Sequence, residues 1–173
     1  GLDVVILDAA RIAEGGTGRN SGFMIDLPHE LTSSDYAGGD SHDRQLTALN
    51  RHAIDFAAQA VAEYGIPDGW FQRSGKINAA ASAAGMAANE SYAKHLHDLG
   101  EAHEMLDAQA MRQITGTDYY RGGLYTPGTA MIPAGGLCSG LRRRAGARGR
   151  AHLRELAGPD HRDRGAGLAA GDR

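Results

Sequence analysis

The sequence predicts a mixed α/β fold in which short strands alternate with amphipathic helices. Three observations support this prediction. A β-branched apolar run occupies residues 3–8, two longer stretches repeat apolar side chains at helical spacing, and short apolar runs next to glycines lie among them. A chain of 173 residues can bury one hydrophobic core, with room for part of a second domain.

The first elements are a strand and a glycine-rich loop. Residues 3–8 contain Val-Val-Ile-Leu and end in Asp8, which is typical of a buried parallel strand. Residues 15–22 read Gly-Gly-Thr-Gly-Arg-Asn-Ser-Gly, and four glycines would make a helix costly there, so a loop is expected. A short apolar segment follows over residues 23–27, and an exposed loop is expected over residues 32–41 because Ser, Asp and Gly cluster there.

A long helix is predicted from about Asp43 to Tyr64. Its apolar side chains recur every three or four residues and would form one buried face. The members of this predicted face are Leu46, Leu49, Ala53, Phe56, Ala60 and Val61. Gly65 follows as a C-terminal cap, so the helix is expected to end there.

The next elements follow in quick succession. They are a strand or strand pair over 70–79 with a bend at Gly75, a helix over 83–99 capped by Gly100, a strand over 103–107, a helix over 108–114 with Asp107 as its N-cap, a strand over 122–126, and a helix over 133–141. This order predicts a small sheet accompanied by helices.

The composition changes after residue 141. Residues 1–141 contain nine basic and 17 acidic residues, whereas residues 142–173 contain nine arginines and four acidic residues. Apolar periodicity ends there, and no strand is expected. Two interpretations fit this change: a disordered basic tail, or a stretch translated out of frame.

Bulk composition excludes several functions. The net charge of −3 and the absence of aromatic residues among the arginines of residues 142–173 argue against a nucleic-acid partner. No apolar stretch approaches the roughly 18 residues that cross a bilayer, so no membrane partner is expected. The single Cys138 excludes an internal disulfide and fits a cytoplasmic location.

The strand end and the glycine-rich loop are the strongest candidates for chemistry. A carboxylate at the end of a buried strand can accept two hydrogen bonds from a ribose, and glycines let a backbone approach a phosphate closely. The candidate cofactor-binding residues are Asp8, Gly15, Gly16, Thr17, Gly18, Arg19, Asn20, Ser21 and Gly22. The alternatives are a solvated or helix-capping aspartate and a flexible surface turn.

Three histidines invite a metal interpretation, but their pattern does not support it. His95 and His97 are two residues apart on a predicted helix and therefore point to different sides, and nothing completes a ligand set with His103. We expect solvated histidines and no metal site.

These segments resemble the D-amino acid oxidase family of FAD-dependent oxidoreductases, which includes glycine, sarcosine and gamma-glutamylputrescine oxidase-like flavoproteins. The apolar strand ending in Asp8 and the run Gly-Gly-Thr-Gly-Arg-Asn-Ser-Gly-Phe carry most of the likeness. Three later stretches agree in order and spacing: Phe71-Gln-Arg-Ser-Gly-Lys-Ile, Glu104-Met-Leu-Asp-Ala-Gln-Ala-Met, and Gly123-Leu-Tyr-Thr-Pro with Ile132-Pro-Ala. The resemblance covers residues 1 to about 141.

The resemblance implies a Rossmann-like FAD-binding domain combined with part of a substrate-binding domain. Asp8 would bind the adenosine ribose, and the loop over 15–22 would run beside the pyrophosphate and the isoalloxazine. The implied reaction is oxidation of a C–N bond in a small amine or amino acid. The expected divisions are a partial FAD-binding domain (1–42), a segment leading into the substrate domain (43–132), a return helix (133–141) and the tail (142–173).

The sequence departs from the family pattern at both ends. The first strand and its G-x-G-x-x-G turn are absent, and the strand expected after Leu141 is replaced by arginine-rich sequence. We therefore expect a truncated chain that binds FAD weakly or not at all and does not turn over alone. The alternative is a non-catalytic fragment that does not hold flavin. No residue stands out as a catalytic base.

Overall fold

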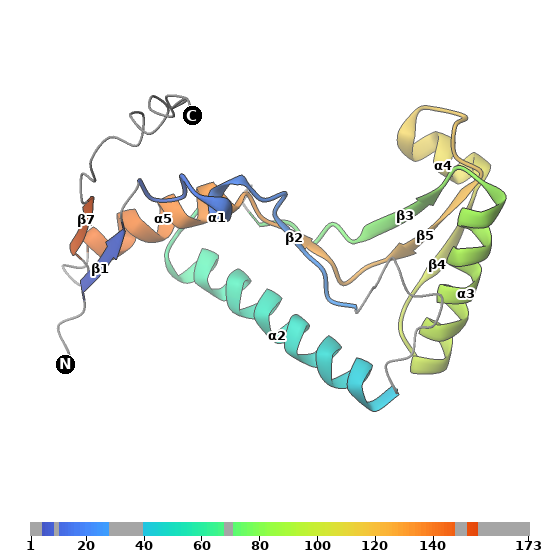
Figure 1. The fold of residues 1–173 in the computed structure, drawn as a ribbon, viewed down its shortest axis with the longest axis horizontal. Coiled ribbons are helices and arrows are strands. Elements are labelled where there is room, and N and C mark those ends of the chain that lie inside the picture. Colours follow the sequence, from blue (N-terminus) through green and yellow to red (C-terminus); the bar gives the residue numbers. More distant parts are fainter. Residues whose placement is uncertain (1–4, 9–10, 28–39, 68–70, 148–151, 156–173) are drawn as a thin grey trace, which may run out of the picture. The chain divides into compact units, whose positions relative to one another are not determined.

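The computed structural model describes residues 5–8, 11–27, 40–67, 71–147 and 152–155 (Figure 1). The chain divides into two compact units. Unit 1 contains residues 1–21 and 134–173, and unit 2 contains Gly22–Pro133. None of the helices in the described ranges combines the length and hydropathy needed to cross a membrane.

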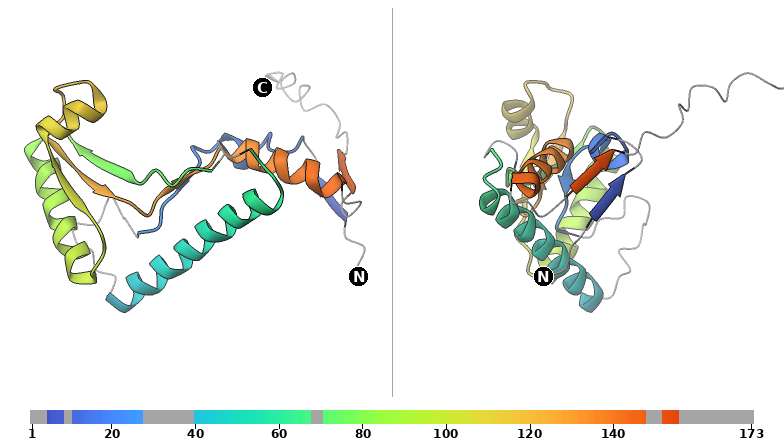
Figure 2. Two further views of the ribbon diagram at one scale, coloured as in Figure 1. Left: turned by 180° about the vertical axis from the view of Figure 1, so that it is seen from behind. Right: turned by 90° about the vertical axis from the view of Figure 1, so that its left-hand side faces the viewer.

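Unit 1 is built around a parallel strand pair. Strand β1 (Val5–Asp8) pairs with β7 (His152–Glu155), and Val5 lies opposite His152 while Asp8 lies opposite Glu155. The two strands lie side by side and run in the same direction (Figure 2). Helix α5 (Ala134–Ala147) precedes β7 in the chain, so a helix leads into the strand that pairs with β1.

Strand β7 corrects the prediction that no strand follows residue 141. The predicted return helix over 133–141 also continues, because α5 extends to Ala147. Alanine and arginine have high helix propensity, so the arginine-rich residues 142–147 suit the end of a helix. The partner of β7 is β1, almost the whole chain away, and local sequence patterns do not reveal such a pairing.

The glycine-rich loop contains one helical turn, α1 (Gly16–Arg19), where the sequence predicted loop throughout. The side-chain Nδ2 of Asn20 donates to the carbonyl oxygen of Thr17 at 2.6 Å and closes the end of this turn. A Cβ atom on Gly18 would lie 1.7 Å from the carbonyl oxygen of Ala13. The turn therefore forms despite its glycines because only a glycine permits this backbone contact.

Unit 2 contains a three-stranded antiparallel sheet in the order β3-β5-β4. Its strands are β3 (Lys76–Ala80), β5 (Gly122–Thr126) and β4 (Glu104–Asp107), and helices α3 (Ala83–Leu99) and α4 (Ala108–Thr115) accompany them. These five predicted segments of strand and helix after Gly75 are confirmed. The predicted caps are confirmed too: Gly100 adopts φ 77° after α3, and the Asp107 carboxylate accepts from the Ala110 N–H at 2.8 Å.

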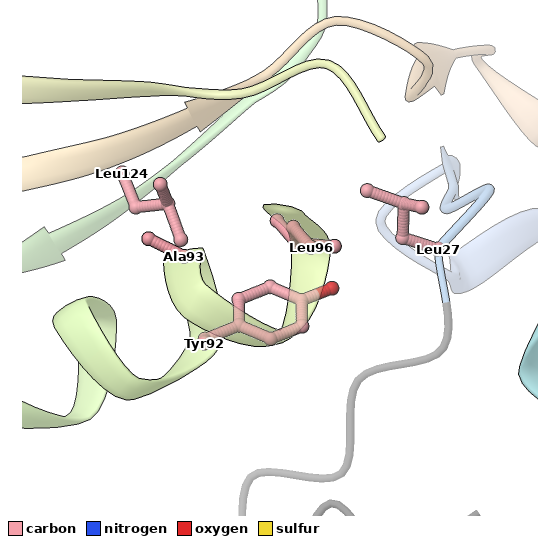
Figure 3. Packing of buried hydrophobic residues seen from close by; sticks show 5 residues of the cluster. All are labelled: Leu27, Tyr92, Ala93, Leu96 and Leu124. Carbon is pink, nitrogen blue, oxygen red and sulfur yellow. The ribbon is translucent and has the colours of Figure 1, made fainter. Parts of the chain in front are cut away.

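Helix α3 covers one face of this sheet and forms the hydrophobic core with it. Leu124 at the centre of β5 is fully buried, and so is Tyr92 of α3. Figure 3 shows Tyr92, Ala93 and Leu96 on α3 grouped with Leu124, while Leu27 approaches from the segment after β2. The core therefore joins an early segment of the chain to the sheet.

A second, smaller ribbon lies at the beginning of unit 2. Strand β2 (Phe23–Met24) pairs with β6 (Ala130–Met131) in antiparallel fashion, and Gln72 bridges to Met131. Gly22 adopts φ +76°, and its carbonyl oxygen accepts from the Ile132 N–H at 2.9 Å. The first and last segments of unit 2 are therefore joined by backbone hydrogen bonds.

The long helix is confirmed as α2 (Asp40–Glu63), but its predicted buried face is wrong in part. Of the predicted face, Val61 is buried, and the other buried side chains of this helix are those of Asp43, Thr47, Ile54 and Ala57. Leu49 and Phe56, two members of the predicted face, are 60% and 68% exposed. Two rows of residues with helical spacing lie next to each other on this helix. The less apolar row is the one that is buried in unit 2.

The buried face of α2 predicts different effects on stability for substitutions at two nearby positions, Ile54 and Phe56. We expect Ile54→Val to lower the free energy of unfolding by about 0.5–1.5 kcal/mol, because Ile54 is 1% exposed and loses a packed methylene group. Phe56→Leu is expected to change it by less than about 0.5 kcal/mol, since Phe56 is largely in solvent. Urea unfolding of both variants measures the difference, and a larger loss for Phe56→Leu would contradict this assignment of the face.

Some predictions lie outside the described residues. They include most of the expected loop over 32–41 and the start of the strand predicted over 70–79. The bend predicted at Gly75 is confirmed, because this residue adopts φ +67° immediately before β3. The cap predicted at Gly65 is confirmed by φ 57° and by the hydrogen bond from the Ile66 N–H to the Val61 carbonyl oxygen at 3.0 Å.

Candidate functional site

Asp8 occupies the last position of strand β1, as the sequence predicted for the ribose-binding acid. Its register partner, Glu155, ends the neighbouring parallel strand. Ligands of α/β proteins bind outside the carboxyl ends of parallel strands. Both acidic residues belong to that edge of the pair, and Glu155 is a candidate that the sequence analysis did not single out.

The glycine-rich loop presents hydrogen-bond donors to solvent. Thr17, Arg19 and Ser21 are exposed, and the side chain of Asn20 is held against Thr17. A Cβ atom added at Gly15 or Gly16 would meet no atom within 4 Å. This stretch therefore combines an open backbone with one cation and two hydroxyl groups.

Two of the candidate glycines have structural reasons to be glycine. Gly18 lies against the Ala13 backbone in unit 1. Gly22 begins unit 2, and a Cβ atom there would lie 1.9 Å from the carbonyl oxygen of Ile132. These close contacts account for both glycines without a ligand, so the residues best suited to touch a cofactor are the exposed ones between Gly15 and Ser21.

The donor set fits the phosphate end of a dinucleotide. Arg19 supplies a permanent positive charge, and Thr17 and Ser21 supply neutral donors for phosphate oxygens. The glycines at 15 and 16 leave room for an anion to approach the main chain. The residues of this loop are therefore chemically suited to the phosphates of FAD.

One of the three histidines considered above, His95, is not solvated as predicted. His95 Nε2 lies 2.9 Å from Asp43 Oδ2, and their side chains are 17% and 10% exposed. This pair joins α3 to the beginning of α2. Among the residues that the structure describes, no group of three or more His, Cys, Asp or Glu side chains could hold a metal ion.

A buried carboxylate in unit 2 was missed by the sequence analysis. Asp26 is fully buried, and its Oδ2 accepts from Nε and Nη2 of Arg51 at 3.2 and 3.1 Å. Arg51 also binds the carboxylate of Glu101 at 2.6 Å. The hydrogen bond to Glu101 raises the pKa of Arg51, and Asp26 adds to this effect against the opposing effect of burial. The available signal was an aspartate inside the apolar run of residues 23–27.

The space beside Asp26 is closed by a glycine and a threonine. A Cβ atom on Gly128 would lie 1.8 Å from Asp26 Oδ2, and Thr129 Oγ1 lies 3.5 Å from Asp26 Oδ1. Asn50 donates from Nδ2 to the backbone oxygen of Asp26 at 3.1 Å. This network joins the segment after β2 to α2, to the loop before β6 and to the segment after α3.

Lys76 lies in the same region of unit 2. It begins β3, is half-buried, and its Nζ lies 5.9 Å from the centre of the Tyr92 ring. Burial lowers the pKa of Lys76, and the nearby charge of Asp26 opposes this shift. No hydrogen bond or ion pair of this ammonium group occurs within the described part of the chain.

Comparison with known proteins identifies the family. The chain matches the family described as "DAO: FAD dependent oxidoreductase" over residues 1–172. The likeness therefore includes the arginine-rich C-terminal stretch, and the expectation that it stops near residue 141 is wrong. A search of curated proteins found no significant match.

Solved structures of similar fold include two glycine oxidases. The enzyme from Geobacillus kaustophilus has a TM-score of 0.68 at 18% identity, with 87% of this chain and 39% of that chain covered. The enzyme from Bacillus cereus ATCC 14579 has a TM-score of 0.69 at 17% identity, with coverages of 90% and 40%. Iminodiacetate oxidase from Chelativorans sp. BNC1 has a TM-score of 0.63 at 19% identity, with coverages of 89% and 40%.

These structures share their fold with this chain, which spans about 40% of their length. The family match extends over nearly all of the sequence, including the strand that ends in Asp8 and the glycine-rich loop. The chain belongs to the DAO family of FAD-dependent oxidoreductases.

Proposed function

We propose that this chain takes part in the FAD-dependent oxidation of a C–N bond in a small amine or amino acid. The observation that carries the proposal is the exposed donor set of Thr17, Arg19 and Ser21, placed after a strand that ends in an acid. Family membership supports FAD as the cofactor. The similar structures named as oxidases of glycine and iminodiacetate support a small amino acid or amine as the substrate.

Each loop residue has a separate task in this proposal. The Asp8 carboxylate accepts hydrogen bonds from the ribose of the adenosine half. The Arg19 guanidinium compensates the charge of the pyrophosphate, and the hydroxyls of Thr17 and Ser21 donate to its oxygens. When bound, FAD would supply the two-electron acceptor for oxidation of the C–N bond.

The alternative is a non-catalytic chain that does not hold flavin. The observation that favours it is the coverage of about 40% of the glycine oxidase structures. Those structures contain a further part of the family fold that this sequence does not span. We therefore expect the 173-residue chain to bind FAD weakly and to need additional polypeptide for turnover.

The test is a titration of FAD fluorescence quenching with the 173-residue chain and with its Arg19→Gln variant. We expect weak, saturable binding to the original chain and about tenfold weaker binding or worse to Arg19→Gln. The reason is that a hydrogen bond to a charged group contributes roughly 1.5–3 kcal/mol. Circular dichroism of both proteins checks that the fold is retained.

Arg112→Gln is the matched control for this titration. It removes the same charge from an exposed position of α4, where Arg112 pairs only with Asp118 among the contacts described, at 2.9 Å. FAD affinity should be unchanged in this variant. Equal losses in the two variants would place the effect in the overall charge, and complete absence of binding to the original chain would favour the non-catalytic alternative.

A further inference from the structure

The two lysines of this sequence, Lys76 and Lys94, differ in exposure and in ion pairing. The Lys94 side chain is 78% exposed, and its Nζ lies 2.7 Å from Asp98 Oδ2. Lys76 is half-buried, and the described residues offer its Nζ no carboxylate at ion-pair distance. The chain thus carries a sheltered amine and a solvated, ion-paired one.

The surroundings of Lys76 are mostly apolar or already occupied. The ring of Tyr92, which is 1% exposed, lies beneath the ammonium group. Asp26 is the nearby acid, but its Oδ2 is held by Arg51. The ammonium group is therefore kept near a negative charge without donating a hydrogen bond to it.

The neighbouring strand adds an unused polar group. Thr126 lies directly opposite Lys76 in the β3–β5 register, so their side chains leave the sheet on the same face. Thr126 is fully buried, and its Oγ1 has no hydrogen-bond partner in the described part of the protein. Unsatisfied buried hydroxyls are costly, which makes this a place where a polar ligand atom or water would be stabilised.

We propose that Lys76 is a nucleophilic amine that forms a reversible imine with small aldehydes or 2-oxo acids. Desolvation in an apolar environment is a general way to activate a lysine, because it disfavours the charged ammonium form. Burial lowers the pKa of Lys76, whereas the hydrogen bond to Asp98 raises the pKa of Lys94. The two shifts have opposite signs, in agreement with the contacts of the two side chains.

The proposed step conserves atoms and electrons. The neutral Nζ attacks the carbonyl carbon, a C–N bond forms as the carbonyl π bond breaks, and one nitrogen proton moves to the oxygen. Loss of the resulting hydroxyl group with the second nitrogen proton releases water and leaves the imine. No oxidant or reductant is involved.

The choice of carbonyl compounds rests on the proposed function. Oxidation of a C–N bond gives an imine, and its hydrolysis gives an aldehyde or a 2-oxo acid. Lys76 would therefore bind the carbonyl product of that reaction. The nucleophilicity of Lys76 does not depend on FAD, so it can be tested by adding the carbonyl compound directly.

The experiment traps the imine on the 173-residue chain with glyoxylate and sodium cyanoborohydride near neutral pH. Peptide mass spectrometry then locates the carboxymethyl groups. We expect Lys76 to carry severalfold more adduct than Lys94, and the ratio to approach one when the same labelling is done in concentrated urea. The ratio should also fall as the pH rises, because Lys94 then loses its proton as well.

Two variants complete the test. Lys94→Arg should leave the adduct at Lys76 unchanged, and Lys76→Arg should remove it while keeping a cation over Tyr92. Equal labelling of the two lysines in the folded chain, or a ratio that urea does not change, would overturn the proposal. The ratio is measured within the original chain, so the result stands even where Lys76→Arg does not fold. A negative result here leaves the FAD titration unaffected.

Discussion

Gly128→Ala is expected to lower the free energy of unfolding by about 3 kcal/mol or more. The added Cβ would lie 1.8 Å from Asp26 Oδ2 and 2.8 Å from its Oδ1. Asp26 has no room to yield, because it is fully buried and Arg51 holds the same oxygen with two N–H groups. Overpacking of buried sites costs about 1–3 kcal/mol, and here the intruding atom also displaces a charged hydrogen-bond acceptor.

Urea unfolding followed by circular dichroism measures this effect, and Gly116→Ala provides the comparison. Gly116 adopts φ +74°, but a Cβ atom there would meet nothing within 4 Å. Its replacement should therefore cost only the strain of a left-handed backbone, about 1 kcal/mol. Similar losses in the two variants would show that the contact with Asp26 is not what requires glycine at position 128.

Arg51→Met is expected to cost about 3 kcal/mol, because it leaves the buried Asp26 carboxylate without its cation. Removal of one partner of a buried ion pair costs about 3–5 kcal/mol. The lower end applies here, since the Arg51 side chain is 46% exposed and water can reach part of the site. Methionine keeps most of the apolar stem, so the loss reports the charge and its hydrogen bonds.

Arg73→Met is the matched control for that substitution. Arg73 pairs with Asp55, but the two side chains are 51% and 55% exposed. Exposed ion pairs contribute about 0–1 kcal/mol, so this variant should stay close to the original chain in thermal and urea unfolding. The assignment of Asp26 as a buried anion that depends on Arg51 fails if both arginine variants lose the same small amount.

Local signals in the sequence predicted most elements of unit 2. The glycines at 65 and 100 end α2 and α3, and Asp107 caps α4, because these signals act within one turn of the residue that carries them. The strand ending in Asp8 was predicted for the same reason, since a β-branched run needs no distant partner to be recognised. Features set by neighbouring residues are accessible from sequence.

Features set by distant residues were not accessible. Strand β7 forms by pairing with β1. Its own sequence, His-Leu-Arg-Glu, contains no pattern typical of a strand. The buried face of α2 depends on which stripe meets the rest of unit 2, and the more apolar stripe is the one left exposed at Leu49 and Phe56. Tertiary contacts decided both cases.

The candidate site divides in the same way. The hydrogen-bond donors of the glycine-rich loop were predicted, because they lie close together in the sequence, within residues 15–22. The Asp26–Arg51–Glu101 network was not, since it brings together three charges separated by 25 and 50 positions in the chain. Lys76 likewise gains its environment from Tyr92 on another element.

The hydrogen bond between Gly22 and Ile132 has a topological consequence. Unit 2 is continuous in sequence, whereas unit 1 is assembled from two separate stretches on either side of it. Unit 2 is thus an insertion whose entrance and exit are adjacent, as the 2.9 Å contact between its two ends demonstrates. Such a closed insertion can change in length while the chain on either side of it keeps the same two points of attachment.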